Sequence, residues 1–343
     1  MSWRAVRKLL CVRLDSIGDV LMTTPAIRAC RESFDCRTVL LTSDAGKVAA
    51  HLVPEIDAVI PFAAPWMKAA AAHADLDMIR RLAEERFDAA VIFTVYSQSA
   101  LPAAYLCYLA GIPLRLAHCR ENPYELLTDW VPDPEPAATV RHEVQRQLDL
   151  VASVGAHTAN TRLSLSVPEA ARACVRRLLP PREGPLVVIH PGASAASRRY
   201  PPEQFARAAD LVIEETGCHA VFTGDAAEAQ LVGAVQGAMR RASQSLVGRL
   251  NLAELGALID EADLVICNNT GPAHMAAALG TPVVDLYALT NPQHTPWEVP
   301  SRVLFHDVPC RNCYKSICPQ GHHDCLKQVA PERVASAALE LLA

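Results

Sequence analysis

Short apolar runs that alternate with helix-like segments constrain the fold of this chain more than any other feature. The pattern begins with KLLCVRLD (8–15) and restarts with PLVVIHPGA (185–193), after a polar stretch that ends in PPREG. Apolar runs separated by amphipathic helices predict buried parallel strands with helices on both faces of the sheet. Two such series predict an α/β protein of two Rossmann-like domains that face a central cleft.

The same pattern predicts the individual elements. In the first series we expect strands over 8–15, 37–43, 58–62 and 87–95, and helices over 20–33, 75–86 and 141–155. In the second series we expect strands over 185–193, 218–224 and 263–269, and helices over 168–179, 201–217, from Asp225, over 251–262, from Gly271 and over 330–342. The predicted domains span 1–167 and 168–329, and residues 330–343 form a C-terminal helix.

Charge and hydropathy limit the partners and the location. The formal net charge is −5 with both signs interspersed, whereas nucleic-acid-binding domains are usually basic, so nucleic acid is not an expected partner. The most apolar window, 101–114, holds two prolines and falls short of the ~20 residues of a spanning helix. The N-terminal apolar run is short and broken by Arg13, unlike a secretory signal. We expect a cytoplasmic protein, with contact at a membrane surface left open and the oligomeric state unknown.

The first polar loop, RLDSIGD, follows the predicted strand 8–15 and ends in Asp19 at the start of a helix. Ligands of open α/β sheets bind beyond the carboxyl ends of the strands, so a general base can sit at Asp19. An aspartate at this position also caps helices, and the loop alone does not decide between the two roles. The loop lacks GxGxxG, which gives a dinucleotide site little support.

The loop HPGASAASRR holds the same position after strand 185–193. Gly192 allows backbone to approach a ligand closely, and Ser194 follows it. Arg198 and Arg199 can form forked contacts with phosphate oxygens. Two solvated surface arginines are the alternative interpretation.

The loop FTGDAAEAQ has the same strand–loop–helix form with acidic residues. After Gly224, a carboxylate can accept hydrogen bonds from ribose hydroxyls, and Glu228 is the better candidate for this. Asp225 as a helix cap is the competing interpretation.

The segment VICNNTGPAH places polar side chains where a buried strand meets a helix. Asn269, Thr270 and the amides after Gly271 converge at a helix N-terminus, whose partial positive charge favours a pyrophosphate. His274 lies one turn further on and can add a donor, although a lone histidine here is more often structural.

Four cysteines, Cys310, Cys313, Cys318 and Cys325, lie in CRNCYKSICPQGHHDC near the C-terminus. Close cysteine pairs with further ligands along the chain are typical of structural zinc sites, and His322 or His323 can replace one cysteine. An iron–sulfur cluster also takes four cysteines. Two disulfides, or four reduced thiols, are the remaining alternatives. If the cluster holds a metal, we expect zinc ahead of iron–sulfur, in a structural role that fixes the loop after residue 305.

Together these segments resemble family 9 glycosyltransferases, the ADP-heptose:lipopolysaccharide heptosyltransferases and their relatives. The resemblance rests on VRLDSIGDVLMTTPAIRACRES, HPGASAASRRYPPEQFA, FTGDAAEAQ and LAELGALIDEADLVICNNTGPAHMAAALGTPVVDLYA in this order, with the cysteine-rich tail. It implies a GT-B fold with an acceptor-binding N-terminal domain and a nucleotide-sugar-binding C-terminal domain. It also implies inverting transfer with no cofactor for the chemistry, and a saccharide or glycolipid acceptor reached at the inner membrane.

The resemblance also implies roles for single residues. Asp19 matches the proposed catalytic base of the family, and Thr270, Gly271 and His274 match its donor-phosphate loop. Glu228 resembles the ribose-binding acid. These assignments imply transfer of a sugar, in the first place heptose from ADP-heptose, to a saccharide hydroxyl.

Two positions depart from the family pattern. Arg198 stands where the family usually has a lysine that contacts donor phosphate, which keeps the charge and changes its geometry. Asn269 stands where the family usually has aspartate, and an amide can donate where a carboxylate only accepts. Donor-sugar recognition is therefore expected to differ. The alternatives are a GT-B enzyme that uses another nucleotide sugar, including a 2-epimerase that needs no acceptor, and a weakly catalytic binding protein.

Overall fold

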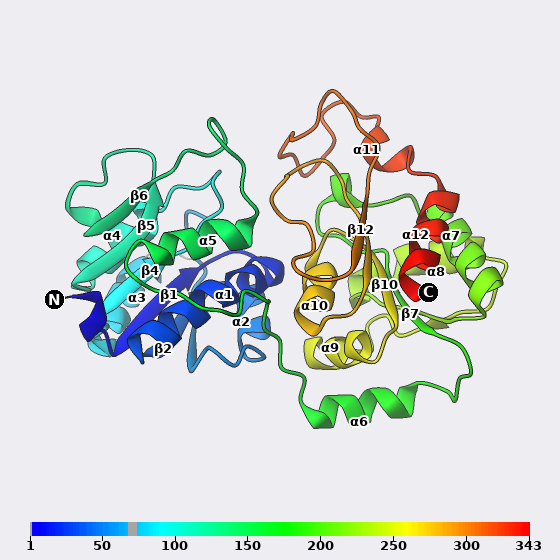
Figure 1. Ribbon diagram of the computed structural model, residues 1–343, viewed down its shortest axis with the longest axis horizontal. Helices are drawn as coiled ribbons and strands as arrows, with labels where there is room; N and C mark the ends of the chain where they lie inside the picture. The colour runs from blue at the N-terminus through cyan, green and yellow to red at the C-terminus, as the bar shows by residue number, and fades with distance from the viewer. Residues whose placement is uncertain (1, 68–73) are drawn as a thin grey trace. The chain divides into compact units, whose positions relative to one another are not determined.

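The computed structural model describes residues 2–67 and 74–343, and the chain divides into two compact units, Met1–Ser166 and Val167–Ala343. Each unit contains a parallel β-sheet with helices on both faces (Figure 1). The predicted α/β fold class is therefore confirmed.

The first unit has a six-stranded sheet in the order β3-β2-β1-β4-β5-β6. Its strands are β1 (Lys8–Arg13), β2 (Arg37–Thr42), β3 (Ala58–Pro61), β4 (Ala89–Ile92), β5 (Leu114–Cys119) and β6 (Asp129–Pro132). Its helices are η1 (Trp3–Ala5), α1 (Ile17–Phe34), α2 (Asp44–Ala50), α3 (Ala74–Glu85), α4 (Leu101–Leu109), η2 (Tyr124–Leu126) and α5 (Glu143–Ala152). Helix α1 packs against α2 and α5 in one layer, and α3 packs against α4 in the other.

Successive side chains of β1 point to opposite faces of the sheet, which decides the face on which each residue lies. Leu10 and Val12 belong to the buried cluster that α4 covers. Because successive strand side chains alternate, Cys11 and Arg13 point to the opposite face, where α1 and α5 lie. Arg13 is therefore turned toward α5 although it stands in an apolar strand.

Helix α1 accommodates a proline in its interior. Pro25 has no N–H to donate to the carbonyl of Leu21, and the hydroxyl of Thr24 donates to that carbonyl instead, at 2.7 Å. The helix therefore continues through Pro25 to Phe34.

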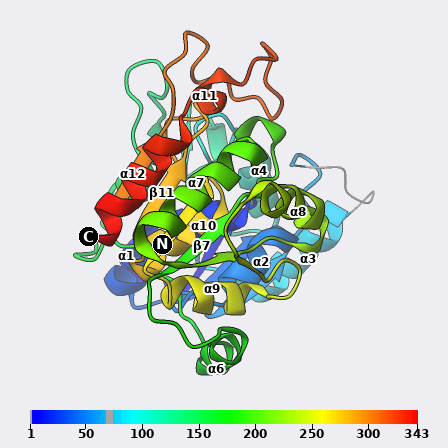
Figure 2. The ribbon, with the colours of Figure 1, turned by 90° about the vertical axis from the view of Figure 1, so that its right-hand side faces the viewer.

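The second unit has a six-stranded sheet in the order β12-β11-β10-β7-β8-β9. Its strands are β7 (Leu186–His190), β8 (His219–Phe222), β9 (Gln244–Ser245), β10 (Leu264–Asn268), β11 (Val283–Leu286) and β12 (Ser301–Leu304). Its helices are α6 (Glu169–Leu178), η3 (Ala196–Arg198), α7 (Pro202–Thr216), η4 (Ala226–Glu228), α8 (Ala229–Ala238), α9 (Leu252–Asp260), α10 (Gly271–Leu279), α11 (Asp324–Lys327) and α12 (Pro331–Leu342). Helices α12, α7 and α8 form one layer, and α6, α9 and α10 follow one another on the other side (Figure 2).

Both sheets have the same topology, because each reads 3-2-1-4-5-6 when its strands are numbered from its own first strand. In each parallel sheet, the direction in which successive strands are added reverses once. The reversal lies between β1 and β4 in the first sheet and between β7 and β10 in the second. Crevices at such switch points are where doubly wound sheets bind ligands. Each unit therefore has one favoured site, and the loops selected from the sequence follow β1, β7, β8 and β10.

The sequence did not predict α2, α4, β5, β6, β9, β11, α11 or β12. Strands β6, β9 and β12 are short and lie at or next to sheet edges, where half-exposed side chains give little apolar pattern.

Among the described residues, no helix is both long and apolar enough to cross a membrane.

Candidate active site

Asp19 lies in the first turn of α1, beside the switch point of the first sheet. Its Oδ2 accepts hydrogen bonds from the backbone N–H of Ser16 at 3.0 Å and from the Ser16 hydroxyl at 2.6 Å. Its Oδ1 accepts one from Nη2 of Arg13 at 3.1 Å. Asp19 thus caps the helix and pairs with a cation.

Arg13 is a fully buried cation that binds three carboxylates. Its Nη1 lies 2.7 Å from Glu143 of α5, its Nε lies 3.0 Å from Asp15, and its Nη2 contacts Asp19. Burial raises the pKa of Asp15 to about 6, although the charge of Arg13 opposes that rise. Three carboxylates share one guanidinium here, so the end of β1 attracts hydrogen-bond donors.

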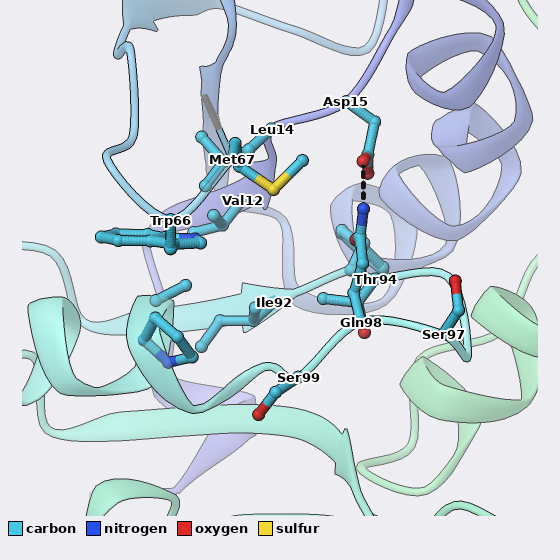
Figure 3. A pocket seen from close by; sticks show the side chains of 13 residues that line it. Val12, Leu14, Asp15, Trp66, Met67, Ile92, Thr94, Ser97, Gln98 and Ser99 are labelled. Carbon is cyan, nitrogen blue, oxygen red and sulfur yellow. Dashed lines mark hydrogen bonds between the residues drawn. The ribbon is translucent and has the colours of Figure 1, made fainter. Parts of the chain in front are cut away.

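A pocket of about 310 Å³ opens at this switch point (Figure 3). The ends of β1 and β4 form its floor, with Val12, Leu14 and Ile92. The carboxylate of Asp15 lines it and accepts a hydrogen bond from Nε2 of Gln98 at 2.6 Å. Trp66 lies on the opposite side from this pair in Figure 3.

In the second unit, the ends of β7 and β8 meet around Glu228. The carboxylate of Glu228 accepts a hydrogen bond from the backbone of Asp225 at 3.0 Å. A Cβ added at Gly192 would lie 1.9 Å from Oε1 of Glu228, so a larger residue there would displace this carboxylate. A Cβ at Gly224 would lie 3.0 Å from Oε2. Two loops therefore hold this carboxylate close to backbone, and burial raises its pKa.

His190 is buried next to the Glu228 carboxylate. Its Nδ1 lies 3.0 Å from the Thr223 hydroxyl, and its Nε2 lies 3.7 Å from Oε2 of Glu228. Burial lowers the pKa of His190 to about 4, so the ring is neutral at pH 7. The contact with Glu228 is therefore not an ion pair under neutral conditions.

Asn268, the last residue of β10, and Asn269, which follows it, are both buried and hydrogen-bonded to the protein. Nδ2 of Asn268 donates to the carbonyl of Pro191 at 2.7 Å, and its Oδ1 accepts from the backbone of Tyr200 at 3.0 Å. Nδ2 of Asn269 donates to Oδ2 of Asp285 at 3.0 Å and to the carbonyl of His294 at 2.6 Å. Asn268 ties β10 to the loop after β7, and Asn269 ties it to β11.

Helix α10 begins beside these asparagines. Thr270 is its N-cap residue, and its hydroxyl donates to the carbonyl of Asn268 at 3.2 Å. Gly271 and the following residues leave the positive end of the helix at the switch point between β7 and β10. His274 is buried one turn into the helix. Thr270, Gly271 and His274 thus lie together on one helix end.

The loop after β7 carries Ser194 and the two arginines. Ser194 is exposed. Nε of Arg199 donates to the carbonyl of Ala193 at 2.8 Å, and the positive charge of Arg199 counteracts the rise in the pKa of Glu228. Burial raises the pKa of Tyr287, and the charge of Arg198 opposes that rise. The charge of Arg199 therefore acts on Glu228, and the charge of Arg198 acts on Tyr287, the residue after β11.

The predicted zinc site is not supported by the arrangement of the C-terminal cysteines. Cys310, Cys313, Cys318 and Cys325 are all free thiols. Across residues 2–67 and 74–343, no group of three or more His, Cys, Asp or Glu side chains is placed to hold a metal ion. Backbone hydrogen bonds fix this loop instead, because the N–H of Ser197 donates to the carbonyl of Ser316 at 3.0 Å and the N–H of Tyr314 donates to that of Thr290 at 2.9 Å.

The sequence did not predict several residues of these sites. A charged residue inside the strand KLLCVR marks Arg13 as unusual, but its partner Glu143 lies 130 residues away. Gln98 and Trp66 stand in loops without a recognisable motif. Asp285, in the buried strand VVDL, is a second charge in an apolar run and could have been noticed for the same reason as Arg13.

Comparisons with known proteins give matches along most of the chain. A profile of the family described as "Glycosyltransferase family 9 (heptosyltransferase)" matches residues 76–323. Lipopolysaccharide heptosyltransferase 2 of Escherichia coli K12 is 26% identical over 358 residues, which cover 98% of both chains. Lipooligosaccharide heptosyltransferase 2 of Campylobacter jejuni is 29% identical over 160 residues, which cover 45% of this chain and 50% of that relative.

Solved structures show the same architecture. A glycosyl transferase family 9 protein from Veillonella parvula superposes with a TM-score of 0.83 at 21% identity, over 100% of this chain and 98% of that one. The E. coli ADP-heptose lps heptosyltransferase II superposes with a TM-score of 0.77 at 23% identity, over 98% of each chain. These likenesses show the predicted GT-B fold.

Proposed function

Because this chain belongs to glycosyltransferase family 9, we propose that it transfers heptose from ADP-heptose to a hydroxyl group of a saccharide acceptor, such as the core of lipopolysaccharide. The observation that carries the proposal is the alignment of the whole chain with the E. coli lipopolysaccharide heptosyltransferase 2. The switch-point sites support it, because one offers a carboxylate for the acceptor and the other a helix end for a phosphate.

In the first unit, Asp19 acts as the general base. It takes the proton from the acceptor hydroxyl, whose oxygen attacks the anomeric carbon from the face opposite ADP. The bond from that carbon to the phosphate oxygen breaks with its electron pair going to ADP, so the configuration inverts. Arg13 positions Asp19 through the 3.1 Å contact. A positioned base of this kind is typically worth about 10²–10⁴-fold in rate.

In the second unit, the N-terminus of α10 at Thr270 and Gly271 receives the diphosphate, with Arg198, Arg199, Ser194 and His274 around it. Their charges and dipoles stabilise the negative charge that grows on the leaving phosphate. Glu228 accepts hydrogen bonds from the ribose hydroxyls. The chemistry uses side chains and backbone dipoles and requires no metal or other cofactor.

The proposed setting is the cytoplasm, with peripheral contact at the inner membrane. A nucleotide sugar serves as donor, and a lipid-linked saccharide presents the acceptor hydroxyl from the membrane surface. The family membership supports this setting through the lipopolysaccharide heptosyltransferases among the relatives.

The test is an incubation of the purified protein with ADP-heptose and a lipopolysaccharide core saccharide that ends before the heptose. We expect ADP release that depends on the acceptor, a product heavier by one heptose in mass spectra, and an inverted anomeric signal in NMR spectra. ADP-glucose and UDP-N-acetylglucosamine serve as competing donors. Turnover of a nucleotide sugar without any acceptor would instead indicate a 2-epimerase-like or hydrolytic enzyme.

A further inference from the structure

The pocket between the ends of β1 and β4 has the two kinds of wall that a sugar ring needs. Trp66 and Met67 provide a half-buried apolar side, and Asp15 with Gln98 provides a polar side (Figure 3). Ser97 and Ser99 add hydroxyl groups at the rim. Aromatic side chains pack against apolar faces, while a few placed polar groups fix orientation and specificity.

The polar side is arranged to receive hydroxyl donors. Oδ2 of Asp15 faces Nε of Arg13 at 3.0 Å, and its Oδ1 accepts from Gln98 at 2.6 Å. An ionised carboxylate only accepts hydrogen bonds, whereas the Gln98 amide can both donate and accept. Since Arg13 is already shared with Asp19 and Glu143, it leaves little positive charge for a further anion.

From this geometry we infer that the pocket is the subsite for the acceptor sugar, and that Asp15 and Gln98 select an uncharged ring through its hydroxyl groups. The inference rests on the proposed glycosyl transfer and specifies its acceptor. Asp15 and Asp19 bind the same guanidinium, so a ring held by Asp15 has a neighbouring hydroxyl close to Asp19. Asp15 and Gln98 bind and orient the acceptor, and Asp19 takes the proton.

The same arrangement discriminates against an acceptor that carries a phosphate or a carboxylate at this ring. Such a group would face the Asp15 carboxylate at a site where water is partly excluded and charge repulsion is strong. Among the described residues that line the pocket, Asp15 is the one ionisable side chain. The subsite therefore favours a neutral methyl heptoside over the corresponding heptoside phosphate.

The experiment compares Asp15→Asn, Gln98→Ala and Trp66→Ala with the wild type, using a methyl heptoside and its 4-phosphate as acceptors and ADP-heptose as donor. Asp35→Asn is the matched control. Asp35 is exposed at the opposite end of α1, in a left-handed conformation that asparagine also adopts. Trp66→Phe keeps an aromatic wall and should restore binding lost in Trp66→Ala. Thermal unfolding of each variant monitors the fold.

We expect the KM for the neutral heptoside to rise about 10-fold or more in Asp15→Asn and Gln98→Ala. The KM for ADP-heptose should stay at the wild-type value. In Asp15→Asn, the preference for the neutral heptoside over its 4-phosphate should become smaller. An acceptor KM equal to that of Asp35→Asn in both variants would overturn the inference and leave glycosyl transfer intact.

A wild type that transfers nothing from ADP-heptose would instead overturn the proposed function. Calorimetric binding of the methyl heptoside, which needs no turnover, then decides the inference. Binding that weakens in Asp15→Asn supports the subsite, and binding that is absent or unchanged in the variant rejects it.

Discussion

Asn269 donates a hydrogen bond from Nδ2 to Oδ2 of Asp285 at 3.0 Å, and this contact joins β10 to β11. Asp285 is fully buried, and its Oδ1 has no hydrogen-bond partner within the described part of the chain. Burial raises the pKa of Asp285 to about 7, while the bond from Asn269 opposes that rise. The family resemblance leads us to expect a carboxylate at position 269. In this chain an amide stands there, and a carboxylate stands on the neighbouring strand.

The titration of Asp285 predicts how stability depends on pH. An unfolded aspartate has a pKa of about 3.9, so between pH ~4 and ~7 the folded state binds a proton that the unfolded state has released. This group therefore makes the free energy of unfolding fall as pH rises through that window. Asp285→Asn should remove the fall, measured as the difference between urea unfolding curves of wild type and variant from pH 4 to 8. A difference that does not vary with pH would contradict the prediction.

The contact also predicts a non-additive pair of substitutions. Asn269→Asp places two carboxylates about 3 Å apart in a buried site, where one must be protonated, so the variant should be strongly destabilised at pH 7. The double variant Asn269→Asp/Asp285→Asn exchanges the two groups and should recover most of the lost stability. If donor recognition depends on this position, the double variant should change donor ranking more than nucleotide affinity. Additive losses of stability would show that the two residues are not coupled.

Asp19→Asn tests the general base. Asparagine keeps a capping oxygen but loses the charge that faces Arg13, so we expect the free energy of unfolding to drop by only about 1 kcal/mol. Turnover should fall by about 10²-fold or more. The measurement is initial-rate kinetics at saturating donor and acceptor. A variant that transfers sugar near the wild-type rate would show that Asp19 is a cap alone.

Arg13→Met tests the shared cation. Removing it leaves Asp15, Asp19 and Glu143 without their common partner, and breaking a buried pair typically costs about 3–5 kcal/mol. Arg13→Lys should restore only part of this, because one ammonium cannot reproduce the planar fork. Chemical denaturation gives the free energies. The additional change Glu143→Gln in the Met variant should recover stability, and a failure to do so would mean that Glu143 is not the main uncompensated charge.

Arg198→Ala and Arg199→Ala test the phosphate loop. Each should weaken ADP binding and make the remaining affinity less sensitive to salt, because one charge contact with the diphosphate is lost. Arg207→Ala is the matched control, since Arg207 is an exposed arginine on α7 that pairs with exposed Glu332. Calorimetry at two salt concentrations measures the effect. If both variants match Arg207→Ala, the two arginines belong to the solvated surface.

The fold class was predictable because burial leaves a local pattern. A strand covered on both faces must be apolar along its length, as in LVVIH of β7 and LVICN of β10. The helices between such strands carry their own amphipathic period, and the polar loops after them mark the ligand edge of each sheet. The edge strands β6 and β12 escaped prediction because exposure removes that pattern.

The sequence by itself determined the two α/β series, the family, and the candidates Asp19, Glu228 and Thr270, because each follows from residues adjacent along the chain. Only the tertiary structure decided which distant groups meet. Glu143 reaches Arg13 across 130 residues, Asp285 meets Asn269 from the next strand, and Trp66 and Gln98 share a pocket with Asp15. The four cysteines, close in sequence, form no metal-ligand group within the described residues. Side-chain contacts depend on sheet order and strand register, which bring together residues that no local spacing connects.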